Sequence, residues 1–187
     1  KPLFAAPRVN NGSKKGGAHM KLLVAYMTKT GNTKKIAEAI FGELTGDKVI
    51  KPIEEVESIE GYDVAFLGFP IHQMGPDKKT TKLLEKHCVN GRKIVLFITH
   101  AGPEGASDLQ PMLEKFRQAA SKAEIFDFFD CQGELAKGVK RIMSIMPNAK
   151  FRMWAKMDNS QGQPDQTRID RAKAFARGVM KKLGEEK

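Results

Sequence analysis

The sequence predicts an α/β domain in which a parallel sheet of five strands is covered by helices on both faces. Short apolar runs alternate with amphipathic segments along the chain, which is the order expected of strands and crossover helices. The apolar runs are unbroken, as in strands that are buried on both faces. A tight turn rich in hydroxyl side chains, residues 28–33, joins the first run to the first amphipathic segment.

The first strand is expected at residues 21–27, because residues 22–25 are all apolar. A helix should follow over residues 32–44, where Ile36, Ile40 and Leu44 recur on one face, and Gly46 should end it. The later strands are expected at residues 47–51, 63–69, 93–99 and 123–130. The later helices are expected within residues 76–88 and over residues 108–121 and 169–183.

Residues 132–167 form an insert that is much longer than a usual connection between a strand and a helix. A helix is expected around residues 134–146, and the chain then passes through Pro147, Trp154 and the polar stretch 158–166. Four of the nine methionines lie between Met143 and Met157. The insert could form a substrate lid, a docking patch for a partner or a contact with a membrane surface, or it could simply cover one side of the sheet.

Composition limits the classes of function. Residues 1–19 contain no acidic residue and look like a leader left by an expression tag, so residues 20–187 are expected to form one domain. No apolar run reaches the 18 residues typical of a membrane span, and no signal peptide is visible. The two cysteines do not make a disulfide framework, so we expect a reducing, cytoplasmic setting.

The chain is basic, with a formal net charge of +10. A basic surface favours acidic partners. Nucleic acid is the weaker interpretation, because the cations are scattered in pairs and few aromatic residues are available to stack on bases. Neither metal-ligand spacing nor a catalytic acid–base arrangement is evident, so no metal-binding or catalytic residue is assigned.

The turn at residues 28–33 has the chemistry of a phosphate site. The first N–H groups of a helix are unpaired and attract anions. Gly31 allows close backbone approach, and the other five residues supply side-chain donors: Thr28, Lys29, Thr30, Asn32 and Thr33. The turn is neither a Walker loop nor a Gly-x-Gly-x-x-Gly turn. The alternative is a capped βα turn without a ligand.

This turn resembles the FMN-phosphate loop of flavodoxins, Thr/Ser-x-Thr-Gly-x-Thr, and the resemblance extends over residues 20–183. It implies a flavodoxin-like three-layer sandwich with strand order 2-1-3-4-5. Ligands of such sheets bind at the carboxyl ends of the strands, at the switch point between strands one and three. In that family hydroxyls and backbone amides hold the phosphate, so Lys29 need not contact it.

Two further loops carry the resemblance. The loop after the third strand resembles the Met-Gly turn that flanks the flavin ring in short-chain flavodoxins, with Met74 packing on the ring and Gly75 near flavin N5; its candidate residues are Pro70, Ile71, His72, Gln73, Met74 and Gly75. The loop after the fourth strand would contact the other side of the ring, through Thr99, His100, Ala101, Gly102, Glu104 and Gly105.

The aromatic residues that flavodoxins stack on the ring are absent from both loops, where this chain has His72 and His100. Weaker stacking should lower flavin affinity or leave the ring more open. Each histidine could instead be a loop residue that makes a backbone hydrogen bond. If the histidines and Lys29 face the ring, their positive charge would make reduced FMN easier to form.

Three functions remain open at this point. The resemblance implies an FMN-binding protein that transfers electrons between partner oxidoreductases, with an acidic redox partner chosen by the basic surface. The alternative is an FMN-dependent reductase of a quinone or another planar organic acceptor, for which the missing aromatic stack would leave room. The third is a binding scaffold that uses the fold without flavin.

Overall fold

The computed structural model describes residues 20–72 and 74–185, so the predicted leader lies outside the described residues. The five strands are all parallel and lie in the order β2-β1-β3-β4-β5, which confirms the predicted topology. Their bounds are β1 (Lys21–Tyr26), β2 (Asp47–Pro52), β3 (Val64–Pro70), β4 (Lys93–His100) and β5 (Glu124–Gln132).

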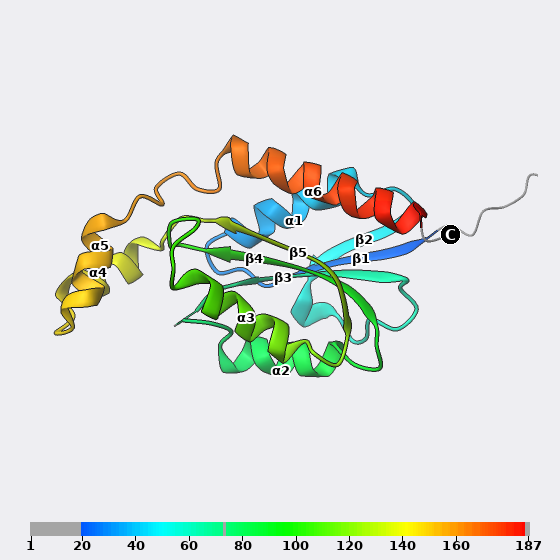
Figure 1. The fold of residues 1–187 in the computed structure, drawn as a ribbon, viewed down its shortest axis with the longest axis horizontal. Helices are drawn as coiled ribbons and strands as arrows, with labels where there is room; N and C mark the ends of the chain where they lie inside the picture. Colours follow the sequence, from blue (N-terminus) through cyan, green and yellow to red (C-terminus); the bar gives the residue numbers. More distant parts are fainter. Residues whose placement is uncertain (1–19, 73, 186–187) are drawn as a thin grey trace, which may run out of the picture.

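Four helices cover the two faces of the sheet (Figure 1). α1 (Asn32–Glu43) and α6 (Gln166–Glu185) lie on one face, and α2 (Lys78–His87) and α3 (Leu109–Ala119) lie on the other. Alternate residues of β1 serve the two cores: Leu22 and Val24 pack under α1 and α6, and Leu23 and Ala25 pack under α2 and α3. A 3₁₀ turn, η1 (Ile53–Glu55), follows β2.

The insert forms two helices, α4 (Lys137–Ile145) and α5 (Ala149–Met157), which pack against each other. This helical pair, residues 137–157, is called the hairpin below. The first helix agrees with the helix predicted around residues 134–146, whereas no element is predicted from the sequence for residues 147–157. Asn148 caps α5 by accepting a hydrogen bond from the Lys150 N–H at 2.9 Å.

The hairpin projects beyond the carboxyl edge of the sheet (Figure 1). Residues 137–145 include no buried side chain, and Ala155 is the one buried residue within 149–157. The alternative that the insert covers one side of the sheet is therefore wrong. The other three roles considered for the insert require an exposed structure near the ligand edge.

Polar contacts hold the hairpin at its root. The Glu134 N–H donates to the Gln163 carbonyl at 3.0 Å, and the Leu135 N–H donates to Ser160 Oγ at 2.8 Å. Lys140 forms an ion pair with Asp158 at 2.8 Å. These contacts cross-link the two chain segments that enter and leave the hairpin. Within residues 20–72 and 74–185, no helix has the length and apolarity needed to span a membrane.

Candidate functional site

The phosphate turn lies at the carboxyl end of β1, where it opens α1. Gly31 is the N-cap of α1 and adopts a left-handed φ of 91°, a conformation that favours glycine. The Gly31 N–H donates to Thr28 Oγ1 at 3.0 Å, which closes the turn. Because glycine offers no capping side chain, the N–H groups of the first helical turn are left for an anion.

Two side chains of the turn face the protein rather than solvent. Thr33 is buried, and its hydroxyl oxygen lies 2.8 Å from that of Thr99 at the end of β4. The Asn32 side-chain amide donates to the Glu134 carbonyl at 2.9 Å, at the root of the hairpin. Lys29 and Thr30 are exposed. The turn therefore presents its backbone N–H groups, Lys29 and Thr30 to a ligand. Asn32 and Thr33 instead fix the turn to the rest of the protein.

The loop after β3 is closed by a pair of hydrogen bonds. The His72 N–H donates to the Gly75 carbonyl at 2.9 Å, and the Gly75 N–H donates to the His72 carbonyl at 3.2 Å. Met74 has a φ of 73°, which is strained for a residue with a side chain, and its carbonyl accepts from Lys115 Nζ at 3.0 Å. The predicted Gln73 lies outside the described residues.

His72 lies within electrostatic reach of Lys29 in the phosphate turn. Burial lowers the pKa of His72, Lys29 lowers it further, and Asp77 opposes both. Burial and Lys29 both favour the neutral imidazole over the positively charged form. Its Nε2 atom is buried and has no hydrogen-bond partner among the described residues, which leaves one polar atom for a ligand to satisfy.

His100 has a structural role at the end of β4. Its side chain is 2% exposed, with Nε2 3.2 Å from a carboxylate oxygen of Asp130 and Nδ1 2.9 Å from the Gly102 carbonyl. Both ring nitrogens thus have partners inside the protein. The backbone hydrogen bond considered as an alternative is present and ties the loop after β4 to its own strand, while the contact with Asp130 ties His100 to β5.

Glu104 also braces this loop. Its carboxylate forms ion pairs with Arg168 at 3.2 Å and Arg171 at 2.8 Å, both on α6. It accepts a hydrogen bond from the Gln132 N–H at 3.2 Å. Gly105 follows in a turn with a φ of 79°. We conclude that Glu104 and Gly105 position the loop, whereas the preceding residues face the site.

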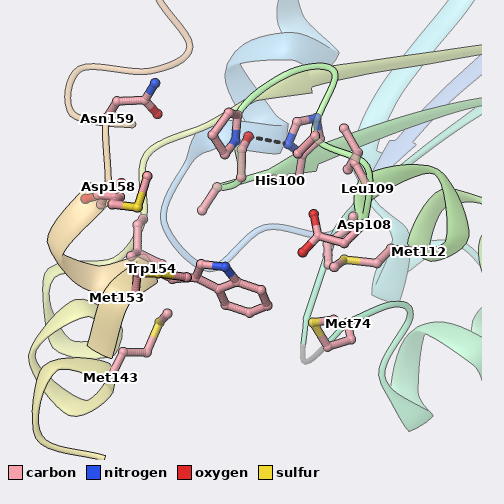
Figure 2. Close-up of a pocket in the computed structure, with 17 residues that line it drawn as sticks. Met74, His100, Asp108, Leu109, Met112, Met143, Met153, Trp154, Asp158 and Asn159 are labelled. Carbon is pink, nitrogen blue, oxygen red and sulfur yellow. Dashed lines mark hydrogen bonds between the residues drawn. The ribbon is translucent and has the colours of Figure 1, made fainter. Parts of the chain in front are cut away.

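A cavity of about 380 Å³ lies between the two loops and the hairpin (Figure 2). Five predicted residues line it, namely Ile71, Met74, His100, Ala101 and Gly102. The structure adds further residues from the loop after β4, from α3 and from the insert: Pro103, Ala106, Asp108, Leu109, Met112, Leu135, Met143, Met153, Trp154, Met157, Asp158 and Asn159. Most of this lining is apolar, as in sites for planar organic ligands.

The other predicted residues in the described part of the chain lie around this cavity but not in its lining. Pro70 is the last residue of β3, and Thr99 is the residue before the last of β4. The phosphate turn stands beside the β3 loop, as the charge interaction between Lys29 and His72 indicates. The structure thus brings the three predicted segments to one edge of the sheet.

Sequence reasoning considered the insert as a substrate lid, but it assigned none of its residues to the site, above all not Trp154. The indole reaches from α5 into the cavity (Figure 2). A signal was present: Asn148 is a good N-cap, and Phe151, Trp154 and Ala155 follow at helical spacing. The residues on the other side of the cavity, such as Met74 and Met112, lie far away in sequence, so periodicity alone could not place this helix beside them.

The comparisons with known proteins agree with this geometry. A family model described as a flavodoxin domain matches residues 23–177. The chain belongs to the flavodoxin family. It is 34% identical over 172 residues to the flavodoxin-like domain-containing protein BilS of Clostridioides difficile (strain CD3), with 86% of this chain and 97% of that protein covered.

Solved structures show the same fold at low identity. An archaeal flavodoxin superposes with a TM-score of 0.56 at 16% identity, over 88% of this chain and 99% of that one. Oxidised flavodoxin 2 from Bacillus cereus superposes with a TM-score of 0.53 at 19% identity, over 87% of this chain and 99% of that one. At these identities the likeness concerns the fold alone.

FMN is the cofactor that membership of this family assigns to the chain. The residues present fit it. The start of α1 offers N–H groups for the phosphate. The cavity has the size of a small-molecule site and an apolar lining for a planar ring. The buried, unpartnered Nε2 of His72 lies on the loop that joins these two regions.

Proposed function

We propose that this flavodoxin family member is an electron carrier that passes electrons between partner oxidoreductases and docks them through its hairpin. The observation that supports this most is the surface chemistry of the hairpin beside the flavin cavity. Bound FMN supplies the redox chemistry. The protein supplies the phosphate turn, the two loops that flank the ring, and a docking surface within reach of the ring.

The hairpin is basic and apolar at once. Residues 137–157 contain six cations and no acidic residue: Lys137, Lys140, Arg141, Lys150, Arg152 and Lys156. Six large apolar side chains are exposed in the described part of the chain, and five of them lie on the hairpin: Val139, Ile142, Ile145, Met153 and Met157. Exposed apolar groups ringed by one sign of charge are typical of a surface that binds proteins of the opposite charge.

The test measures electron transfer from the dithionite-reduced, FMN-loaded protein to an oxidised acidic ferredoxin by anaerobic stopped flow. The rate should fall as NaCl rises, because salt screens the attraction between the two surfaces. Arg141→Glu combined with Lys156→Glu should lower the rate at low salt by about tenfold. Neither residue lines the cavity, so flavin binding should persist.

Lys122→Glu is the matched control, because Lys122 is exposed just before β5 at the opposite end of the sheet. With a basic cytochrome c as the acceptor, the hairpin substitutions should raise the rate of electron transfer at low salt instead of lowering it. If the rate of electron transfer to ferredoxin changes neither with salt nor with the hairpin substitutions, this docking surface is ruled out.

The second candidate is an FMN-dependent reductase of a quinone or another planar organic acceptor. The methionine-rich cavity under the hairpin supports it, because such a space could hold an acceptor against the flavin. Steady-state oxidation of NADH or NADPH with a soluble quinone separates the two. Rapid turnover by the protein alone favours the reductase, whereas reduction that requires a separate flavoprotein reductase favours the carrier.

We keep the cytoplasm as the proposed location. Cys88 and Cys131 are both free and buried, and a reducing compartment suits such thiols.

A further inference from the structure

We propose that Trp154, carried by the hairpin, stacks on the isoalloxazine ring of FMN and supplies the aromatic contact that the two flavin loops lack. The ligand class is therefore a flavin ring, and the binding residue comes from the insert rather than from the loops after β3 and β4. The inference rests on the flavin site of the proposed function, but it does not depend on which acceptor takes the electrons.

A single large aromatic side chain lines the cavity. Of its 17 lining residues, Trp154 carries the one large aromatic ring, and His100 has both ring nitrogens engaged within the protein. Neither residues 70–75 nor residues 99–105 include Phe, Tyr or Trp. Figure 2 shows the indole extending from α5 toward the side of the cavity that holds Met74 and Met112.

The indole is held in place by its own helix. Lys150 Nζ lies 4.7 Å from its ring centroid, and the Phe151 ring meets it edge-on at a centroid distance of 5.6 Å. Trp154 is only partly buried although it lies inside the cavity, so part of its surface is open to a ligand. An indole and several thioethers around one space form a suitable site for a flat, electron-poor aromatic ring.

Contacts at the root of the hairpin connect the helix that carries Trp154 to the phosphate turn. The Asn32 side chain donates to the Glu134 carbonyl at 2.9 Å, three residues before α4 begins. Lys140 and Asp158, at 2.8 Å, then join α4 to the segment that follows α5. A ligand with a phosphate at one end and a planar ring at the other would thus contact two elements that are already linked.

The test compares the affinities of wild type and variants for FMN and for riboflavin, measured by quenching of flavin fluorescence. Riboflavin has the same ring but no phosphate. Trp154→Leu should weaken binding of both flavins by the same factor, about tenfold, as loss of a stacking contact does elsewhere. Trp154→Phe should keep most of the affinity, because it keeps an aromatic face. The absorption spectrum of flavin bound to the wild type should show a long-wavelength shoulder, which should be absent for Trp154→Leu.

Ile145→Ala is the matched control. Ile145 lies on the same hairpin, is 78% exposed and does not line the cavity, so its variant should bind both flavins like wild type. Equal flavin affinities and spectra for wild type and Trp154→Leu would overturn the role of Trp154. So would a loss confined to FMN, because it would place the indole at the phosphate end.

A wild-type protein that binds neither flavin would instead overturn the flavin site itself, together with the proposed function. Unchanged flavin affinity in Trp154→Leu, combined with slower reduction of a quinone, would also overturn the proposal and would assign the indole to the acceptor.

Discussion

The hydroxyl oxygens of Thr33 and Thr99 lie 2.8 Å apart in the interior of the protein. Thr33 belongs to the first turn of α1 and Thr99 to the end of β4. The pair therefore joins the phosphate turn directly to the strand that carries the second flavin loop. One hydroxyl donates to the other, which gives each of these buried groups a partner within the protein.

Thr33→Val should destabilise the flavin-free protein, because it leaves the buried Thr99 hydroxyl without its partner. Loss of one member of such a pair costs about 1–3 kcal/mol. Chemical unfolding measures this cost. The double variant Thr33→Val with Thr99→Val should lose less than the sum of the two single losses. Strict additivity in this cycle would show that the two hydroxyls do not interact.

Gly133→Ala should weaken FMN binding through the phosphate turn. A Cβ at residue 133 would lie 2.8 Å from the side-chain nitrogen Nδ2 of Asn32 and 2.9 Å from the Cβ of Asn32. Because the Asn32 Cβ is fixed to the backbone, the turn itself must shift. We expect FMN affinity to fall by about tenfold, equivalent to roughly 1.4 kcal/mol, with riboflavin less affected.

Gly178→Ala is the control for that substitution. Gly178 is exposed on α6, and a Cβ there would meet nothing within 4 Å. It should leave FMN affinity unchanged and raise stability by about 0.4–1 kcal/mol, because alanine favours a helix more than glycine does. If Gly133→Ala binds FMN as well as Gly178→Ala does, the turn tolerates the shift.

Stability should fall as the pH falls below about 6.5, in part because of His87. This side chain is 2% exposed, and its Nε2 has no hydrogen-bond partner among the described residues. Burial lowers the pKa of His87 below its usual 6.5, and Lys86 lowers it further. Between the folded and unfolded pKa values the unfolded chain binds more protons, so acid favours unfolding there.

His87→Leu removes this titrating group and should lose less stability than wild type between pH 7.5 and pH 5.5, a range that spans the usual histidine pKa of about 6.5. Urea unfolding at the two pH values measures the difference. His72, whose pKa is also lowered, should leave a residual dependence in the variant. Identical pH dependence in the two proteins would assign the effect to other groups.

Neither cysteine should react in the native protein. Burial raises the pKa of both thiols to about 12, and Cys131 is fully buried under α6 although it lies near the ligand edge. Iodoacetamide at pH 8 should label neither thiol until urea is added. Cys131→Ala should retain normal reduction of bound FMN. Rapid native labelling of one thiol, followed by loss of FMN reduction, would contradict a purely structural role.

The sheet could be predicted because each of its strands carries a local signal. Unbroken apolar runs such as residues 22–25 indicate burial on both faces, and the turn at residues 28–33 marks the ligand edge. The structure differs mainly at element ends. For example, β5 extends to Gln132 instead of residue 130, and α6 begins at Gln166 instead of residue 169.

The site was harder to predict, because the roles of its residues depend on partners far away in sequence. Asn32 contacts Glu134 and Glu104 contacts Arg171, contacts that no local pattern reveals. His72 and His100 have similar positions after neighbouring strands, yet one is unpartnered at Nε2 and the other is held by Asp130. Only tertiary structure shows which histidine has both ring nitrogens paired and which does not.

The charge of the hairpin also bears on how the molecule behaves at high concentration. Exposed Ile142, Ile145 and Met157 would favour self-association if nothing opposed it. Lys140 is paired with Asp158, but the other five cations give each hairpin a positive charge, so two hairpins should repel each other. The cations should therefore oppose self-association in dilute buffer, and high salt should weaken this effect because it screens the charges.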